Sequence, residues 1–244
     1  MKRFLLICLI PLLWACEKNQ APLWTGATEI GTFKSGVFAA DAGWTGRITE
    51  AVVDAPTEDY ERILLHFDML RPNAGGSFDL RLTGWVKPLT KPGLLKSAAD
   101  PDDIGSDPIT LVNGWFAGGY INMELRFTAS KNTKVTHFIN LVLDDVSPKN
   151  PEEPDTLRFR LHHNGYGDVF YPTDPKGSNA ADYVTGTAWF CVPSNVFLPE
   201  GTDEMPIKIT WPWYETDDQG LYTDRLKDFS RKGTLKRYPA KLAK

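Results

Sequence analysis

The sequence predicts an all-β fold, and two observations carry that prediction. The 244 residues include 20 Gly and 18 Pro, which is too many for a helical bundle but suits short strands joined by turns. Several segments also alternate apolar and polar residues with the period of a half-buried strand. With 42% hydrophobic and 24% charged residues, the chain has the composition of an ordinary globular protein.

The first strands are expected in the N-terminal third. In residues 63–69 and 78–83 every second residue is apolar, so each segment presents one face to a core. Residues 86–108 break this pattern with Pro, Gly and a cluster of Asp. Because such stretches separate domains, we expect a first domain over 24–104 and a second over 105–218. The Asp cluster lacks the spacing of an EF-hand loop and is interpreted as a solvated linker, not a calcium site.

Four further strands are expected in the second domain. They cover residues 121–127, 135–143, 157–161 and 207–213. Residues 135–143 are nearly all apolar, which indicates a central strand. Pro212 restricts the end of its strand to a sheet edge or a bulge, because it cannot donate a hydrogen bond. These strands and the turns between them predict an antiparallel β-sandwich.

The C-terminal segment, residues 219–244, is expected to be a basic tail. Its last twenty residues carry eight Lys or Arg against a single Asp, a local charge of +7. Tyr222, Leu226 and Phe229 have helical spacing, which predicts one short amphipathic helix near 221–232. We interpret the tail as a solvated, frayed end whose removal leaves the fold intact. Docking on acidic headgroups, on a partner or on the body is the alternative.

The N-terminus predicts export and a lipid anchor. Residues 1–15 join a basic start to an apolar run well short of the roughly 20 residues that span a bilayer, which indicates a signal peptide. Residues 13–16, Leu-Trp-Ala-Cys, resemble a bacterial lipobox. Cleavage there leaves Cys16 as a lipidated N-terminus on a short tether, residues 16–23, and several acyl chains hold a protein firmly at a membrane. A plain signal peptide with a chance cysteine is the alternative.

These features predict an outer-membrane lipoprotein that faces the periplasm or the cell surface. The net charge of −4 argues against a nucleic-acid partner, because phosphate binding needs a basic surface. Cys8 leaves with the signal peptide and Cys16 carries the lipid, so no internal disulfide is expected. Cys191 is interpreted as a buried apolar residue.

The most chemically suggestive stretch is His162-His163-Asn164-Gly165-Tyr166-Gly167-Asp168. Imidazoles and a carboxylate can bind a metal or transfer protons. Neighbouring residues on a strand face opposite sides, so we expect His163 in the core and His162 on the outer face, where they cannot share one ion. We therefore predict no metal, no cofactor and no catalytic group, and we interpret His162 and Tyr166 as candidate ligand contacts. A hydrolase that uses His162, Asp168 and Asp144 is the alternative.

Two tryptophans are further candidate ligand contacts. Trp44 and Trp115 lie beside turns, where an exposed ring can stack on a glycan or a peptide. Burial in the core is the usual place for Trp and is the default interpretation for the others. The sequence contains no phosphate-binding glycine loop, nucleophile elbow or paired-cysteine metal motif.

The second half of the chain resembles a known family. The segments 104–109, 119–122, 137–142 and 157–168 are similar to segments of the NigD-like lipoproteins of Gram-negative anaerobes. The resemblance implies that the first domain is an OB-like β-barrel and that the second is a β-sandwich. It implies no enzymatic activity, and instead a binding or accessory role with a glycan, peptide or protein as ligand. A bacteriocin-associated, immunity-type role is a further alternative.

Overall fold

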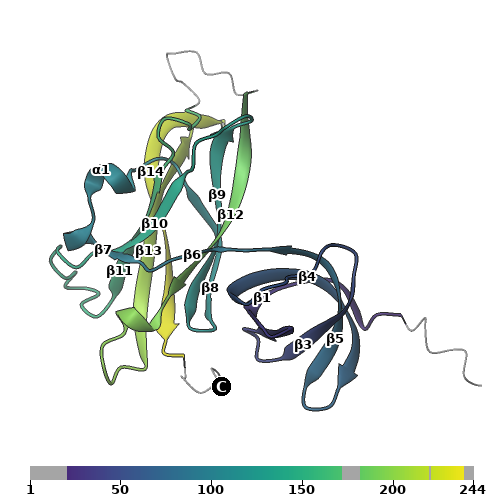
Figure 1. Cartoon of the computed structure of the whole chain (residues 1–244). Helices are drawn as coiled ribbons and strands as arrows, with labels where there is room; N and C mark the ends of the chain where they lie inside the picture. Colours follow the sequence, from purple (N-terminus) through teal and green to yellow (C-terminus); the bar gives the residue numbers. More distant parts are fainter. Residues whose placement is uncertain (1–20, 172–181, 220, 239–244) are drawn as a thin grey trace, which may run out of the picture. The chain divides into compact units, whose positions relative to one another are not determined.

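The computed structural model describes residues 21–171, 182–219 and 221–238, and these are built almost entirely of β-strands (Figure 1). The all-β prediction is confirmed. The chain divides into two compact units after Val86. The signal peptide, Cys16 and the last residues of the expected tail lie outside the described residues.

The first unit is a closed five-stranded barrel. Its strands are β1 (Trp24–Lys34), β2 (Val37–Ala40), β3 (Thr45–Ala51), β4 (Tyr60–Asn73) and β5 (Ser77–Val86). They follow the order β1-β2-β3-β5-β4, in which β3 and β5 are parallel and the other pairs are antiparallel. Alternate residues of β4 and β5 fill the interior, as the sequence pattern predicts, among them Ile63, Leu65 and Leu80. A closed barrel is what the OB-like prediction requires, and the OB-like assignment itself stays a prediction.

The second unit is a sandwich of two β-sheets around one apolar core. One sheet has the order β14-β13-β11-β10-β7. Its strands are β7 (Leu94–Leu95), β10 (Phe138–Leu143), β11 (Leu157–Asn164), β13 (Glu204–Thr216) and β14 (Tyr222–Lys236). The other sheet has the order β6-β12-β9-β8. Its strands are β6 (Leu89–Thr90), β8 (Thr110–Ala117), β9 (Tyr120–Ser130) and β12 (Tyr183–Pro193). The helical turns η1 (Lys96–Ala98), α1 (Pro101–Ile104) and η3 (Asn195–Phe197) complete the unit.

One expectation about strand pairing is wrong. The sandwich is not purely antiparallel, because β11 pairs in parallel with β13, β10 with β7, and β12 with β6. The chain between β11 and β13 passes through β12 in the other sheet, which lets it return in the same direction. The end of β13 that holds Pro212 has one free side, as the sequence predicts, although the strand as a whole lies between β11 and β14. Pairing with β11 ends at Thr210, so the proline lies just past the last paired residue on that side.

The segment expected to be a solvated linker belongs to the sandwich. Strands β6 and β7 each extend one of its sheets, and Ile104 of α1 is buried. The boundary between the two units therefore falls after Val86 and not between residues 104 and 105. Strands of two residues have no readable period, which is why the sequence does not reveal them.

The expected C-terminal tail forms an edge strand of the sandwich. β14 pairs antiparallel with β13 along nearly its whole length, so the predicted helix over 221–232 is wrong. Leu235 is fully buried, and Arg237 donates hydrogen bonds to the carbonyl oxygens of Leu198, Pro199 and Thr202. This part of the chain is therefore docked and not a frayed end. On β12, Cys191 is fully buried, as predicted.

Candidate functional site

A pocket of about 420 Å³ lies on the outer face of the five-stranded sheet. Residues of β10, β11 and β13 form its floor, and the segment of η1 and α1, which lies beside this sheet in Figure 1, forms a wall. Much of the lining is apolar, with contributions from Pro101, Ile104 and Val142. This volume is in the range of small-molecule sites.

Strand alternation sorts the two adjacent histidines onto opposite faces of β11. His163 is fully buried in the core, whereas His162 faces the pocket together with Arg158 and Arg160, as the sequence predicts. The Nδ1 of His162 lies 2.7 Å from the carbonyl oxygen of Gly105, to which it donates a hydrogen bond. Burial lowers the pKa of His162, so its ring is neutral at pH 7.

Glycine is required where the pocket wall approaches β11. Gly105 has a φ of 65°, a conformation that other residues rarely adopt. A Cβ at this position would lie 2.6 Å from the carbonyl oxygen of His163. The glycine thus lets the α1 segment pack against the strand and offer its carbonyl to His162.

Cations from three neighbouring strands form a row across the sheet. Lys208 of β13 pairs with Arg158 of β11 on one side and with Lys232 of β14 on the other. Like charges directly opposite each other destabilise a sheet, so folding alone does not explain the row. Lys232 forms an ion pair with Glu153. Lys208 makes no hydrogen bond or ion pair with any residue in the described part of the chain, although its charge helps to lower the pKa of Glu153, the partner of Lys232.

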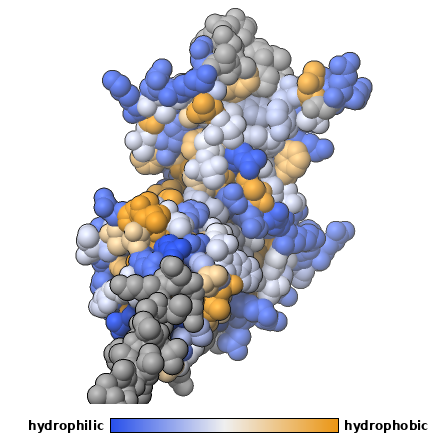
Figure 2. Space-filling view, turned by 90° about the vertical axis from the view of Figure 1, so that its right-hand side faces the viewer, coloured by the Kyte–Doolittle hydropathy of each residue, from blue (hydrophilic) through white to orange (hydrophobic). Residues whose placement is uncertain are grey.

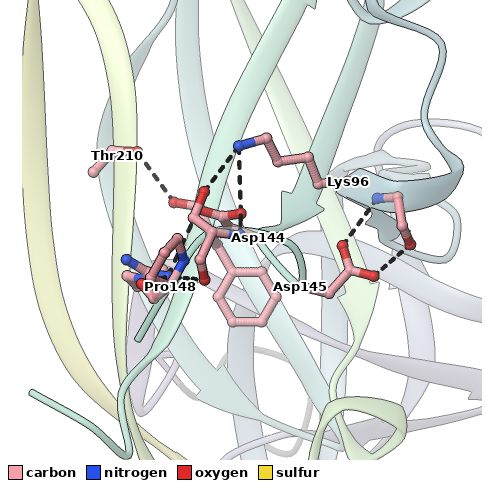
Figure 3. Close-up of polar contacts among 9 residues, drawn as sticks. Lys96, Asp144, Asp145, Pro148 and Thr210 are labelled. Carbon is pink, nitrogen blue, oxygen red and sulfur yellow. Dashed lines mark hydrogen bonds and ion pairs between the residues drawn. The ribbon is translucent and has the colours of Figure 1, made fainter. Parts of the chain in front are cut away.

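Asp144 is held between two cations at the pocket (Figure 3). Its Oδ1 lies 3.4 Å from Nζ of Lys96, and its Oδ2 lies 3.8 Å from Nη2 of Arg158. Burial acts to raise the pKa of Asp144, but hydrogen bonds from Ser147 and Lys96 outweigh it and hold the pKa below its ordinary value. Asp144 is therefore a fixed anion and not a proton donor at pH 7.

The pocket has an excess of positive charge. Arg160 is neutralised by Asp228 of β14 through two parallel hydrogen bonds of 2.7 and 2.9 Å, which hold the pKa of Asp228 below its ordinary value. Lys96 and Arg158 share the single carboxylate of Asp144. Lys208 adds a further positive charge. The pocket lining therefore carries more positive than negative side chains and favours an anionic ligand.

The structure separates the residues considered for a hydrolase. His162 and Asp144 line the basic pocket, whereas Asp168 lines a second, open depression of about 410 Å³. Tyr166 lies at that second depression, where it is 55% exposed and contacts Phe138 edge to face. The three candidate groups thus do not form one site. The expected ligand contacts His162 and Tyr166 also lie at different depressions.

The two tryptophans singled out in the sequence have different surroundings. Trp44 packs edge-on against Phe38, Phe67 and Phe78 in the barrel core. Trp115 contacts Trp189 and lines a cavity of only about 40 Å³, which is too small for more than a few waters. Trp44 thus serves the core, and a ligand contact by either ring stays a prediction.

Sequence reasoning missed His137, which links two other titratable residues. Its Nδ1 lies 2.9 Å from Nε2 of His163, and its Nε2 lies 3.1 Å from Oδ2 of Asp168. The Nδ1 of His163 lies 3.1 Å from the carbonyl oxygen of Pro108. No spacing in the sequence signals these contacts, because they depend on the register of β10 and β11, in which Ile139 pairs with His163.

The neighbouring donors and acceptors determine which ring nitrogens carry protons in the chain of contacts formed by Asp168, His137 and His163. The Pro108 carbonyl can only accept, so Nδ1 of His163 carries a proton. Burial, and then the charge of His137, lower the pKa of His163 to about 4, so its Nε2 is a bare acceptor. Hydrogen bonds outweigh burial and lower the pKa of Asp168 to about 2, so the carboxylate also accepts. With a bare Nε2 on His163, Nδ1 of His137 is the donor of that contact, and Nε2 of His137 faces the carboxylate of Asp168.

We expect the sandwich to lose stability as the pH falls from about 6.5 to about 4. The unfolded chain takes up a proton at His163 near pH 6.5, whereas the folded chain does so only near pH 4. Acid therefore favours the unfolded chain, by about 3 kcal/mol at the lower end of this window. The urea midpoint of the sandwich, followed by hydrogen exchange in β11, measures the effect. The His163→Gln variant, which cannot titrate, should respond less, and equal wild-type midpoints across the window would contradict the assignment.

The surface elsewhere offers no broad apolar face in the view of Figure 2. Hydrophobic residues there form separate groups among hydrophilic ones. Single exposed apolar residues are normal on soluble proteins and need no explanation. Among the described residues, no group of three His, Cys, Asp or Glu is placed to hold a metal ion. The basic pocket is therefore the candidate site.

Comparison with known proteins finds a similarity in the second unit. A family model, the NigD-like C-terminal beta sandwich domain, matches residues 93–176. The solved structure of a NigD-like immunity protein from Bacteroides caccae is 20% identical, with a TM-score of 0.59 over 84% of this chain and 93% of that one. A protein of unknown function from Bacteroides vulgatus is 16% identical, with a TM-score of 0.58 over 89% of this chain and 92% of that one.

A candidate lipoprotein from Bacteroides fragilis is 11% identical, with a TM-score of 0.54 over 90% of this chain and all of that one. At such identities the likeness shows the fold alone. No curated protein matches the chain. Within the described residues, no helix is long and apolar enough to cross a membrane. The matched residues contain all four segments on which the sequence resemblance rests, so the similarity to the NigD-like C-terminal beta sandwich domain lies in this part of the second unit.

Proposed function

We propose that this chain is a lipid-anchored accessory protein of the cell envelope that binds a ligand in the basic pocket without transforming it. The observation that supports this proposal is the pocket itself, which combines a small-molecule volume with an excess of positive charge. Hydrolysis needs a base that can take a proton, or a nucleophile beside such a base. Asp144 is instead tied to Lys96 and Arg158, and Asp168 lines another depression, so Nε2 of His162 faces the pocket without either carboxylate acting beside it as a base or nucleophile.

The binding role is tested with the Cys16→Ala chain, which should be soluble without its lipid. Panels of glycans, peptides and small anions are screened by thermal shift, because a ligand that binds only the folded state raises the melting temperature. Mass spectrometry of the same mixtures records products. We expect saturable binding without product. Product that accumulates with the parent chain and disappears with His162→Ala would establish a hydrolase instead.

The lipid anchor makes a separate prediction about Cys16. The lipobox-like segment and the likeness to a candidate lipoprotein support an anchor at this residue. We expect the Cys16→Ala variant to lose both the membrane fraction and the label from radioactive palmitate, because its acyl chains supply the membrane affinity. The Cys8→Ala variant is the matched control and should keep both. A Cys16→Ala chain that stays in the membrane fraction would place the anchor in another segment.

An immunity-type role is the second candidate function. It is supported by the name of one similar structure, a NigD-like immunity protein, although the identity to that protein is only 20%. On this reading the chain would protect its cell by binding a toxin. A deletion strain that is no more sensitive than its parent to toxins of neighbouring bacteria would remove this candidate.

A further inference from the structure

We propose that the ligand of the basic pocket is an amphiphilic anion. Its single carboxylate or phosphate head would lie between Arg158 and Lys208, and its apolar body would extend along the sheet toward Ile104. This inference rests on the proposed function, because it names the ligand class of the same pocket. Three features of the pocket carry it.

The first feature is a change from charged to uncharged side chains along the pocket face of β11. Arg158 stands at one end of the pocket-facing row, beside Lys208 of the next strand. Arg160 follows and is neutralised by Asp228. His162 stands at the other end, where its ring is neutral. The four residue steps from Arg158 to His162 span about 13 Å of extended strand. The pocket therefore has a charged end and an uncharged end that are separated by about the length of a short amphiphile.

The second feature is the unused binding capacity at the charged end. The hydrogen bonds of Arg158 to the carbonyl oxygens of Ser147 and Pro148, and its contact with Asp144, all involve Nη2. Nη1 and Nε make no hydrogen bond to the described residues, so each can donate a single charge-assisted hydrogen bond to an oxyanion. Lys208 stands directly across from it on β13. An anionic head placed here would relieve the repulsion between these two cations.

The third feature is the apolar wall. Ala99, Pro101 and Ile104 of the segment that covers the sheet face Val142 of β10, which is almost completely buried. An inorganic anion would leave this wall in contact with water, whereas an apolar body would cover it. A ligand with hydroxyl groups along its length would lose hydrogen bonds to water there without replacement. The wall therefore selects a ligand that is apolar beyond its head.

The test measures binding to the Cys16→Ala chain by calorimetry. The probes are decanoate, decyl phosphate, the neutral decanol, and inorganic phosphate as a head without a body. We expect saturable binding of decanoate, of decyl phosphate or of both, and the comparison of these two arms identifies the head. Decanol, which lacks the anionic head, and inorganic phosphate, which lacks the apolar body, should each bind at least roughly tenfold more weakly.

Two variants locate the binding. Lys208→Gln should weaken decanoate or decyl phosphate roughly tenfold, as expected for the loss of one charge-assisted contact. The same change should raise the melting temperature of the ligand-free chain, because it removes like-charge repulsion; a merely structural lysine would lower it. Lys227→Gln is the matched control, because Lys227 pairs with Trp213 on the opposite face of the sheet, and it should change neither quantity.

The Ala99→Trp variant separates this inference from the proposed function. A Trp side chain there should fill the apolar part of the pocket and abolish binding of every pocket ligand. If decanol binds as tightly as decanoate and Lys208→Gln has no effect, the anionic class is overturned, although the pocket still binds. If Ala99→Trp changes no binding that the parent chain shows, or if the parent binds no probe and no member of the screened panels, the proposed function is overturned as well.

Discussion

Removal of residues 222–244 is expected to prevent the sandwich from folding. The cut deletes β14, which pairs with β13 from Lys236 to Tyr222 and buries Leu235 completely. It also removes Asp228, the counterion of Arg160. The lost burial and hydrogen bonds amount to several kcal/mol, comparable with the whole stability of about 5–15 kcal/mol that a domain has. This outcome is the opposite of what the sequence predicts for a frayed tail.

Limited proteolysis measures this effect, because an unfolded sandwich is digested while a barrel over residues 24–86 resists. A chain that ends after Tyr238 keeps every described contact of β14 and is the control. The point variant Leu235→Ala should cost about 3 kcal/mol of unfolding free energy, the usual cost of a cavity at a fully buried leucine. Leu226→Ala, at a position 38% exposed on the same strand, should cost far less. A truncated chain with the parent's melting temperature would show that β14 is dispensable.

Replacement of Asp168 by Ala is expected to destabilise the sandwich by about 4 kcal/mol. The carboxylate lies 3.1 Å from Nε2 of His137, and the two side chains are only 10% and 6% exposed. Its removal leaves this buried nitrogen without its partner, and a buried polar group that loses its partner costs about 1–3 kcal/mol. Asp168 also accepts the backbone N–H of Ser130, which the variant leaves without this acceptor. Urea unfolding at pH 7, followed by hydrogen exchange in β11, gives the number.

A double-mutant cycle with His137→Gln isolates the contact between His137 and Asp168 within this cost. Because both variants remove the same contact, the double variant should lose less free energy than the sum of the single variants. Asp145→Ala is the matched control, since Asp145 is an exposed Asp that hydrogen-bonds to Ser97, and its loss should stay below about 1 kcal/mol. Additive losses in the cycle would show that His137 and Asp168 are not coupled.

Local periodicity was enough to predict the strands and the orientation of the pocket residues. On β11 the alternation alone places His163 in the core and His162 outside with Arg158 and Arg160, because successive residues of any strand face opposite sides. The same rule identified the interiors of β4, β5 and β9. The lipobox-like segment is a local pattern too, and Cys16 itself lies outside the described residues.

Contacts between distant segments could not be predicted in this way. Tyr222, Leu226 and Phe229 have helical spacing, but they are exposed residues of an edge strand, so their positions are not set by a core. The pocket wall comes from residues 96–104, which contain only single turns and follow strands too short to show a period. The meeting of His137 and His163 depends on the pairing of β10 with β11, which no single segment encodes.

The position of β14 at the end of the chain has a consequence for biogenesis. All the strands of the barrel lie within the first 86 residues, so this unit can close before the rest of the chain has been synthesised. The second unit cannot complete its five-stranded sheet until β14, its last strand in chain order, has been synthesised. Until then the bonding edge of β13 stays open to other chains, and aggregation competes with completion of the sheet.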